Sequence, residues 1–99
     1  MIRDIFLGFI RVHLLYHASK EAIFGLDMIR ELERHGYQLS PGTLYPILHK
    51  LESEGYLTSE KRVFSGKVRK YYRTSDSGNE ALKMATIQVV ELIREIGIN

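Results

Sequence analysis

The sequence predicts one small domain, residues 1–99, that is mainly α-helical and carries a single β-hairpin. Three observations support this fold class. A chain of 99 residues with 44% hydrophobic and 26% charged residues has the composition of a globular domain. Apolar residues recur at three- and four-residue steps in four segments, as in amphipathic helices. Between the third and fourth segments, β-branched and aromatic residues flank a short glycine-containing loop, as in a hairpin.

The first two predicted helices cover residues 2–17 and about residues 24–34. Residues 18–25 are expected to form the connection between them. The apolar stripe of the first helix is wider than the face that a helix needs to cover a small core. Gly36 suits the position that follows the end of the second helix.

The third predicted helix has clear start and stop signals. Ser40 can act as its N-cap, Pro41 suits the first helical position, and Gly55 follows its end. Its core-facing stripe repeats at i, i+3, i+4 and i+7 and consists of Leu44, Ile47, Leu48 and Leu51. Pro46 cannot donate a hydrogen bond to the Gly42 carbonyl, so we expect an irregular start to this helix.

The hairpin is predicted from two β-like runs, residues 56–64 and 68–74, joined by the loop at residues 65–67. Ser75 resembles the N-cap of the last helix. A heptad-like apolar seam along that helix consists of Leu82, Ala85, Val89, Leu92 and Ile96. Within the single domain, residues 24–74 form the predicted helix-turn-helix and wing. Residues 1–17 and 75–97 are the predicted dimerisation helices.

The net charge of +2 conceals a strongly basic segment. Residues 61–73 carry six basic side chains and no acidic one, whereas the segments before and after each carry a net charge of −2. Such concentration favours contact with a polyanion over a general role in solubility. The alternative interpretation is a charged edge hairpin protected against aggregation, but edge protection usually mixes the two signs.

Three helices followed by a basic hairpin match the winged helix-turn-helix plan, in which the third helix enters the major groove of DNA. Hydroxyl, imidazole and ammonium groups on the outward face of that helix can bind phosphates and base edges. The DNA-binding residues that we predict are Ser40, Gly42, Thr43, Tyr45, Pro46, His49 and Lys50 on the helix and Lys67, Arg69 and Lys70 on the wing. Taken alone, the helix face is better interpreted as a solvated polar surface; the basic wing makes DNA binding the favoured interpretation.

The wide apolar faces of the two terminal helices predict a homodimer. A membrane-surface helix is less favoured, because these faces lack a Lys- and Arg-rich polar side. The predicted interface residues are Phe6, Phe9, Leu82, Val89, Leu92 and Ile96. A symmetric dimer also suits the reading of palindromic sites.

Other classes of function find little support. The absence of Cys excludes disulfide scaffolds and thiol chemistry, and no nucleophile or phosphate-loop motif is present, so we expect no enzyme and no cofactor. His13 and His17 have the i, i+4 spacing of metal ligands, but the sequence offers no obvious third ligand and we assign no metal. No targeting or membrane-spanning segment is apparent, which predicts a cytoplasmic protein.

One motif resembles a known family. The run from Ser40 to Leu48, followed by Leu51, Glu52 and Gly55, resembles the signature of PadR-like transcriptional regulators. Residues 66–73 resemble the wing of that family, and residues 75–82 resemble the junction into its final helix. The resemblance covers about residues 5–96. Two departures are Phe24-Gly25-Leu26, where the family usually has His-Gly-Tyr, and Val68, where a wing proline is common.

The resemblance implies a dimeric winged-helix repressor that acts on promoter DNA through the third helix and the wing. The single C-terminal helix is similar to the short branch of the family. The leading hypothesis is therefore a homodimeric transcriptional repressor that binds double-stranded DNA. Two alternatives stay open: a winged-helix module that binds a protein partner, and a metal-dependent sensor that uses His13 and His17.

Overall fold

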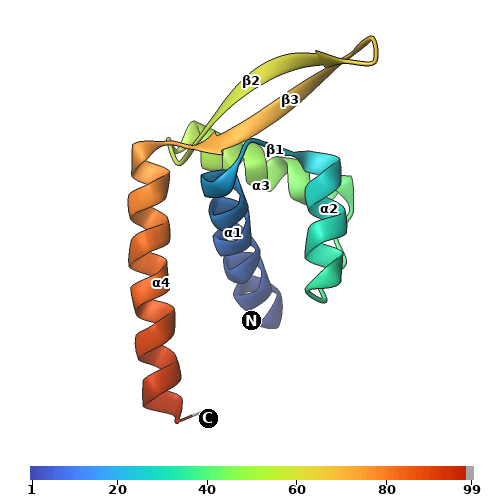
Figure 1. Ribbon diagram of the computed structural model, residues 1–99. Coiled ribbons are helices and arrows are strands. Elements are labelled where there is room, and N and C mark those ends of the chain that lie inside the picture. Colours follow the sequence, from blue (N-terminus) through green and yellow to red (C-terminus); the bar gives the residue numbers. More distant parts are fainter. Residues whose placement is uncertain (98–99) are drawn as a thin grey trace.

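The computed structural model describes residues 1–97, and the last two residues of the predicted domain lie outside this part. Four helices and three strands follow one another along the chain (Figure 1). They are α1 (Ile2–Lys20), β1 (Ile23–Phe24), α2 (Gly25–Arg34), α3 (Pro41–Ser53), β2 (Leu57–Phe64), β3 (Lys67–Thr74) and α4 (Asp76–Ile96). The mainly α-helical fold class and the predicted order of helices and hairpin are confirmed.

The sheet has three strands rather than the two of the predicted hairpin. β1 lies within the segment that the sequence analysis expected to be a plain connection, and that expectation is wrong. It pairs antiparallel with β3, Ile23 opposite Tyr72 and Phe24 opposite Tyr71, giving the order β1-β3-β2. Two residues are too few to show the alternating pattern by which strands are recognised, so only the docking against β3 reveals this strand.

β2 and β3 pair along their whole length, from Leu57 opposite Thr74 to Phe64 opposite Lys67. Only Ser65 and Gly66 lie between the strands, with φ of 50° and 76°. Positive φ at both central residues is typical of the type I′ turn, whose twist matches that of a hairpin. The turn is therefore shorter than the predicted loop, and Lys67 is the first residue of β3.

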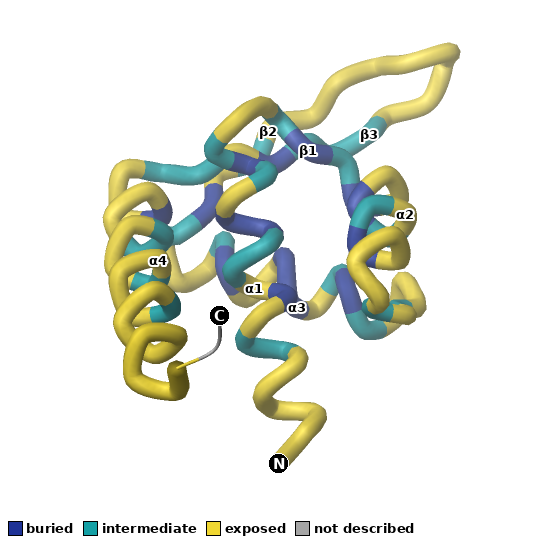
Figure 2. Tube along the Cα trace, turned by 60° about the horizontal axis from the view of Figure 1, so that its bottom comes forward, coloured by how far each residue is buried: buried dark blue, intermediate teal, exposed yellow. Residues whose placement is uncertain are grey.

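The core lies where α1, α2 and α3 meet the base of the sheet (Figure 2). Its buried residues are Ile10, Leu14, Leu15, Ala18, Ile23, Met28, Leu32, Leu44, Ile47, Leu48, Leu51, Leu57 and Tyr72. The predicted core stripe of α3 is buried in full. α3 is continuous from Pro41 to Ser53, without a break at Pro46.

α4 begins against the junction between α3 and β2. Ser75 is its N-cap, as predicted: the amide of Gly78 donates to the Ser75 hydroxyl at 3.0 Å. A Cβ added at Gly78 would lie 2.0 Å from the backbone oxygen of Tyr56, so only glycine allows this close approach. Beyond this anchor α4 extends past the core, and every described residue from 90 onward is exposed (Figures 1 and 2).

Across residues 1–97, none of the helices combines the length and the apolar character that a membrane span requires.

Candidate nucleic-acid interface

The outward face of α3 is polar and accessible. Because the leucine and isoleucine stripe of this helix is buried, the predicted contact residues lie on its other sides. Five of them are exposed and two are half-buried: Ser40, Gly42, Pro46, His49 and Lys50 are exposed, and Thr43 and Tyr45 are half-buried. A Cβ at Gly42 would have only the Ser40 hydroxyl oxygen within 4 Å, so the surface above this glycine is open. A ligand backbone can therefore approach the start of α3 closely.

Tyr45 has a packing role that the sequence did not reveal. Its ring and its hydroxyl lie against the first residue of α2: a Cβ added at Gly25 would be 2.7 Å from Tyr45 Cε1 and 3.0 Å from the hydroxyl oxygen. Gly25 thus makes room for the tyrosine ring and brings α3 close to the start of α2. The contact of Tyr45 with DNA stays a prediction.

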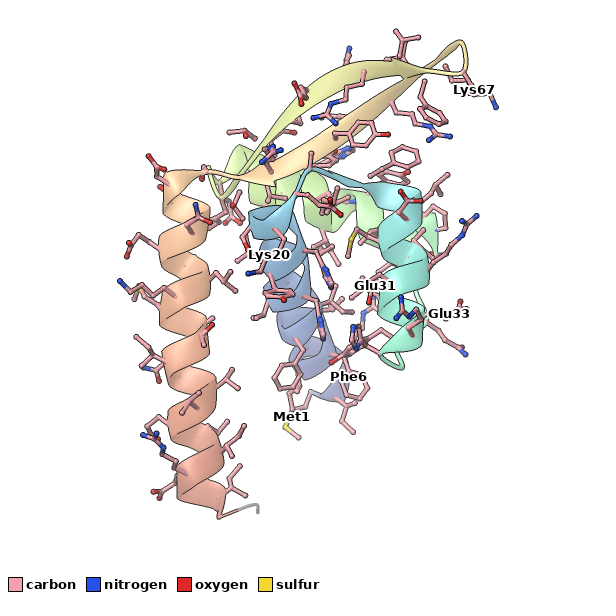
Figure 3. All side chains as sticks on the ribbon, in the orientation of Figure 1. Met1, Phe6, Lys20, Glu31, Glu33 and Lys67 are labelled. Carbon is pink, nitrogen blue, oxygen red and sulfur yellow. The ribbon has the colours of Figure 1, made fainter. Side chains whose placement is uncertain are left out.

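The two faces of the hairpin differ because side chains alternate along a strand. Lys67, Arg69, Tyr71 and Arg73 share one face of β3, and Lys70 and Tyr72 share the other. The Arg69 guanidinium carbon lies 4.7 Å from the centre of the Phe24 ring and 4.4 Å from the centre of the Phe64 ring. Cation–π contacts of this kind hold a guanidinium in place while its N–H groups remain able to donate. Lys67 is exposed near the end of the hairpin, far from the helices (Figure 3).

Glu52 near the end of α3 holds the helix to both long strands. Lys70 Nζ donates to Glu52 Oε1 at 3.0 Å, and the Ser59 hydroxyl donates to Glu52 Oε2. The hydrogen bond from Ser59 and then that from Lys70 lower the pKa of Glu52. The hydrogen bond to Glu52 in turn raises the pKa of Lys70. Both groups are therefore charged at neutral pH, and together with Ser59 they fix the position of the wing relative to α3.

Sequence reasoning missed the roles of Glu52 and Ser59. Glu52 was visible in the family-like motif, but its partners are seven and eighteen residues away along the chain. Only the register of the hairpin brings Ser59, on β2, and Lys70, on β3, to the same carboxylate.

The positive charge of the hairpin is partly neutralised within the chain. Arg62 donates to the carboxylate of Glu60, with its Nε at 3.0 Å, and Lys70 pairs with Glu52. Lys61, Lys67 and Arg73 are exposed, and no ion pair involves them within residues 1–97. The hairpin therefore keeps an excess of accessible cationic groups.

The predicted dimer residues fall into two groups. Phe6, Phe9, Leu92 and Ile96 are exposed, with exposed fractions from 42% to 59%. Leu82 and Val89 are half-buried, and Leu82 packs against the core of its own chain. Further large apolar side chains are exposed on α4 outside the predicted seam: Met84, Ile87, Val90 and Ile93.

The geometry defines a winged helix-turn-helix protein, with an accessible α3 fixed to a basic hairpin. The chain belongs to the PadR-like family of transcriptional regulators, whose family profile matches residues 14–84. The resemblance noted from the sequence is thereby confirmed. The members of this family and the relatives that the chain matches are regulators of transcription, so this chain is a transcriptional regulator and not an enzyme.

Relatives match over most of their length. The chain is 46% identical over 87 residues to the transcriptional regulator Rv3488 of Mycobacterium tuberculosis, covering 88% of this chain and 81% of that protein. A PadR family transcriptional regulator from Eggerthella lenta is 33% identical, with a TM-score of 0.84 over 98% of this chain and 86% of the other. The PadR-like transcriptional regulator BC4206 of Bacillus cereus is 28% identical, with a TM-score of 0.75 over 93% and 94% of the two chains.

Proposed function

We propose that this regulator is a homodimeric repressor that binds double-stranded DNA, with α3 in the major groove and the wing on the flanking backbone or minor groove. One observation carries the proposal. The accessible polar face of α3 is held, through Glu52, to a hairpin whose residues 61–73 contain six basic side chains and no acidic one. A helix and a cationic hairpin in fixed relation suit the simultaneous contact of a groove and its phosphates.

On α3, the proposed contacts are those of the exposed polar face and of the helix start. Thr43 and the Tyr45 hydroxyl are the groups that we expect to discriminate between bases. Ser40, Gly42, Pro46, His49 and Lys50 lie around them and set the approach of the backbone.

On the wing, the intramolecular contacts leave donors for phosphate. An ammonium group has three donors, so Lys70 can keep its bond to Glu52 and still bind a phosphate oxygen. A guanidinium has five N–H donors in its plane, so Arg69 can present them while its faces contact the rings of Phe24 and Phe64. Lys67, exposed near the tip, extends the footprint.

The dimer is proposed from the exposed apolar side chains of α1 and α4. Monomeric proteins seldom leave a contiguous apolar surface of this kind in water. A second copy would cover Phe6, Phe9, Leu92 and Ile96, and the symmetry of the pair would suit a palindromic operator. With DNA as its target, the protein is expected to act in the cytoplasm.

Selection of bound sequences from a random duplex pool, followed by titration of the selected duplex and of a scrambled duplex over a range of salt, tests this function. We expect tighter binding of the selected duplex and a linear loss of log affinity with log salt concentration, because bound cations displace phosphate counterions. Failure to bind any duplex at low salt contradicts the proposal and favours the alternative of a module that binds a protein partner.

A further inference from the structure

Three of the four histidines of the chain lie together where α1 meets the end of α2. His13 and His17 are one turn apart on α1, and His35 is the C-cap residue of α2. One ring nitrogen from each lies within 4.8 Å of the others. The ring centres of His13 and His35 are 4.8 Å apart, and that of His17 is 6.4 Å from each. His35 therefore supplies the third imidazole, which the spacing of His13 and His17 in the sequence could not reveal.

This convergence has the chemistry of a transition-metal site. Imidazole nitrogen is a preferred ligand of zinc and of its neighbours copper and nickel, whereas magnesium and calcium prefer oxygen. With metal–nitrogen distances of about 2.0–2.1 Å, the nitrogens of a tetrahedral site lie about 3.4 Å apart. The three side chains are half-buried or exposed, so they are free to rotate from 4.8 Å toward this spacing when an ion binds.

The carboxylate of Glu31 contacts one member of the cluster, His35. Glu31 on α2 contacts His35 Nε2 through Oε2 at 3.0 Å, and Arg34 Nη1 donates to the other oxygen of Glu31 at 3.2 Å. Histidine ligands commonly bind a carboxylate through the nitrogen that does not face the metal, which sets the tautomer and the ring orientation. With Nε2 engaged by Glu31, Nδ1 of His35 is the nitrogen left for an ion.

The surroundings leave room for a further ligand. A cavity of about 340 Å³ is lined by the three imidazoles and by apolar residues that include Phe9, Leu82 and Val89. Water can enter this cavity and occupy the fourth position of a tetrahedral ion.

We propose that His13, His17 and His35 bind one divalent transition-metal ion of the zinc type, with Glu31 as the positioning residue for His35. The ion joins α1, which carries part of the proposed dimer interface, to the end of α2, from which the chain leads into α3. It is therefore placed to act as an effector of operator binding. This regulatory part rests on the proposed function, whereas the metal site itself does not.

Zinc titration of the full chain by calorimetry tests the site directly. We expect one zinc ion per chain, and an affinity at least tenfold lower in each of the variants His13→Gln, His17→Gln and His35→Gln. His49→Gln is the matched control, because His49 is the one histidine outside the cluster and its loss should leave zinc binding unchanged. Circular dichroism verifies that each variant is folded. Because His35 is exposed, His35→Gln is the substitution that should disturb the core least.

Two further measurements distinguish a specific zinc site from adventitious zinc binding. Glu31→Gln should weaken zinc binding about 10–100-fold, because the ring of His35 is then no longer held in orientation, while Arg34→Gln should change it little. Zinc should raise the melting temperature of the native chain but not that of His35→Gln, because a ligand that binds only the folded state stabilises it. Unchanged zinc stoichiometry in the triple histidine variant, or equal binding of magnesium, overturns the metal site.

The effector role is tested by titrating the selected duplex in zinc and in chelator. Operator affinity should differ at least fivefold between the two conditions for the native chain and not at all for His35→Gln, as expected for coupled sites. Zinc binding with an unchanged operator affinity overturns the effector role alone. If no duplex binds in either condition, the proposed DNA function fails, and the calorimetric stoichiometry still decides the metal site.

Discussion

The wing end of the molecule and the far end of α4 offer a partner opposite kinds of surface. The wing and α3 present charged and polar groups, several of them held in place by hydrogen bonds or aromatic rings of the same chain. The distal half of α4 and the start of α1 present large apolar side chains such as Ile96, which is 59% exposed. The first surface is complete within one chain and suits a polyanion, whereas the second becomes stable only when another apolar surface covers it.

The two ends therefore bind their partners through different interactions: the wing through electrostatic contacts and the terminal helices through burial of apolar surface. Contacts between the wing and DNA phosphates weaken as the salt concentration rises, because each phosphate that a basic side chain neutralises releases bound counterions. Contacts between terminal helices depend on apolar burial, at roughly 25 cal/mol per Å² removed from water. Specific DNA binding should therefore divide into a part that requires dimerisation and a part that each chain supplies.

The largest effect is expected from a charge in the apolar end. Leu92→Glu would place an unpaired carboxylate in the subunit contact, which we expect to weaken dimerisation by about 3 kcal/mol or more, over 100-fold. The resulting monomer holds one recognition helix, cannot span two half-sites about 34 Å apart, and should keep only weak non-specific binding. Sedimentation and operator titration on the same sample measure both quantities.

Gln88→Glu is the matched control, because it adds the same charge at an exposed polar position of α4 and should leave the dimer intact. A folded Leu92→Glu monomer with full operator affinity would overturn the dimer model. A Leu92→Glu variant that stays dimeric would place the interface elsewhere on the molecule.

The next effect concerns base discrimination by α3. Tyr45→Phe keeps the ring that packs on Gly25 and removes only the hydroxyl, so the fold should be unchanged. If the hydroxyl contacts a base, affinity for the selected duplex falls by about 1–3 kcal/mol and affinity for scrambled duplex falls less. Equal decreases on both duplexes would limit the hydroxyl to a backbone contact. Tyr45→Ala, which also removes the packing, gives the larger combined effect for comparison.

A smaller and sequence-independent effect is expected at the wing. Replacing Lys67, Arg69 and Lys70 by Ala should weaken binding to selected and scrambled duplexes alike. It should also reduce the slope of log affinity against log salt by about 0.9 for each phosphate that the wing no longer neutralises. Lys83→Ala on α4 is the control, since it removes an exposed charge outside the proposed interface. An unchanged salt slope in the triple variant would show that the wing does not bind phosphate.

The smallest effect is expected from Glu52→Gln, which weakens the link between α3 and the wing. The pair with Lys70 is partly exposed, so we expect the free energy of unfolding at pH 7 to fall by less than about 1 kcal/mol. The pKa of Glu52 is lowered in the folded chain, so its contribution is present above the unfolded pKa and is lost as the pH falls through the folded pKa.

Urea unfolding of the native chain and of Glu52→Gln at pH 7 and at a series of lower pH values measures this contribution. The difference between the two proteins should shrink as the pH falls through the folded pKa of Glu52, because protonation of Glu52 removes the ion pair from the native chain. A difference that stays constant over the whole pH series would show that the carboxylate charge does not hold the wing.

The features that could be predicted from the sequence are those that depend on residues close together along the chain. The N-cap at Ser75, the proline-led start of α3 and the turn at Ser65 and Gly66 were readable because each reflects the backbone geometry of a few neighbouring residues. The buried stripe of α3 was readable because a helical period places its members on one face. The basic segment needed only a count of charges.

Tertiary structure alone decided the contacts between residues far apart along the chain. The pairing of β1 with β3, the approach of Tyr45 to Gly25 and the placement of Arg69 between two phenylalanine rings depend on strand register and helix packing. The joining of His35 to His13 and His17 depends on where the end of α2 meets α1. No local spacing encodes such contacts, because the free energy that makes them comes from burial of the core, which fixes the elements relative to one another.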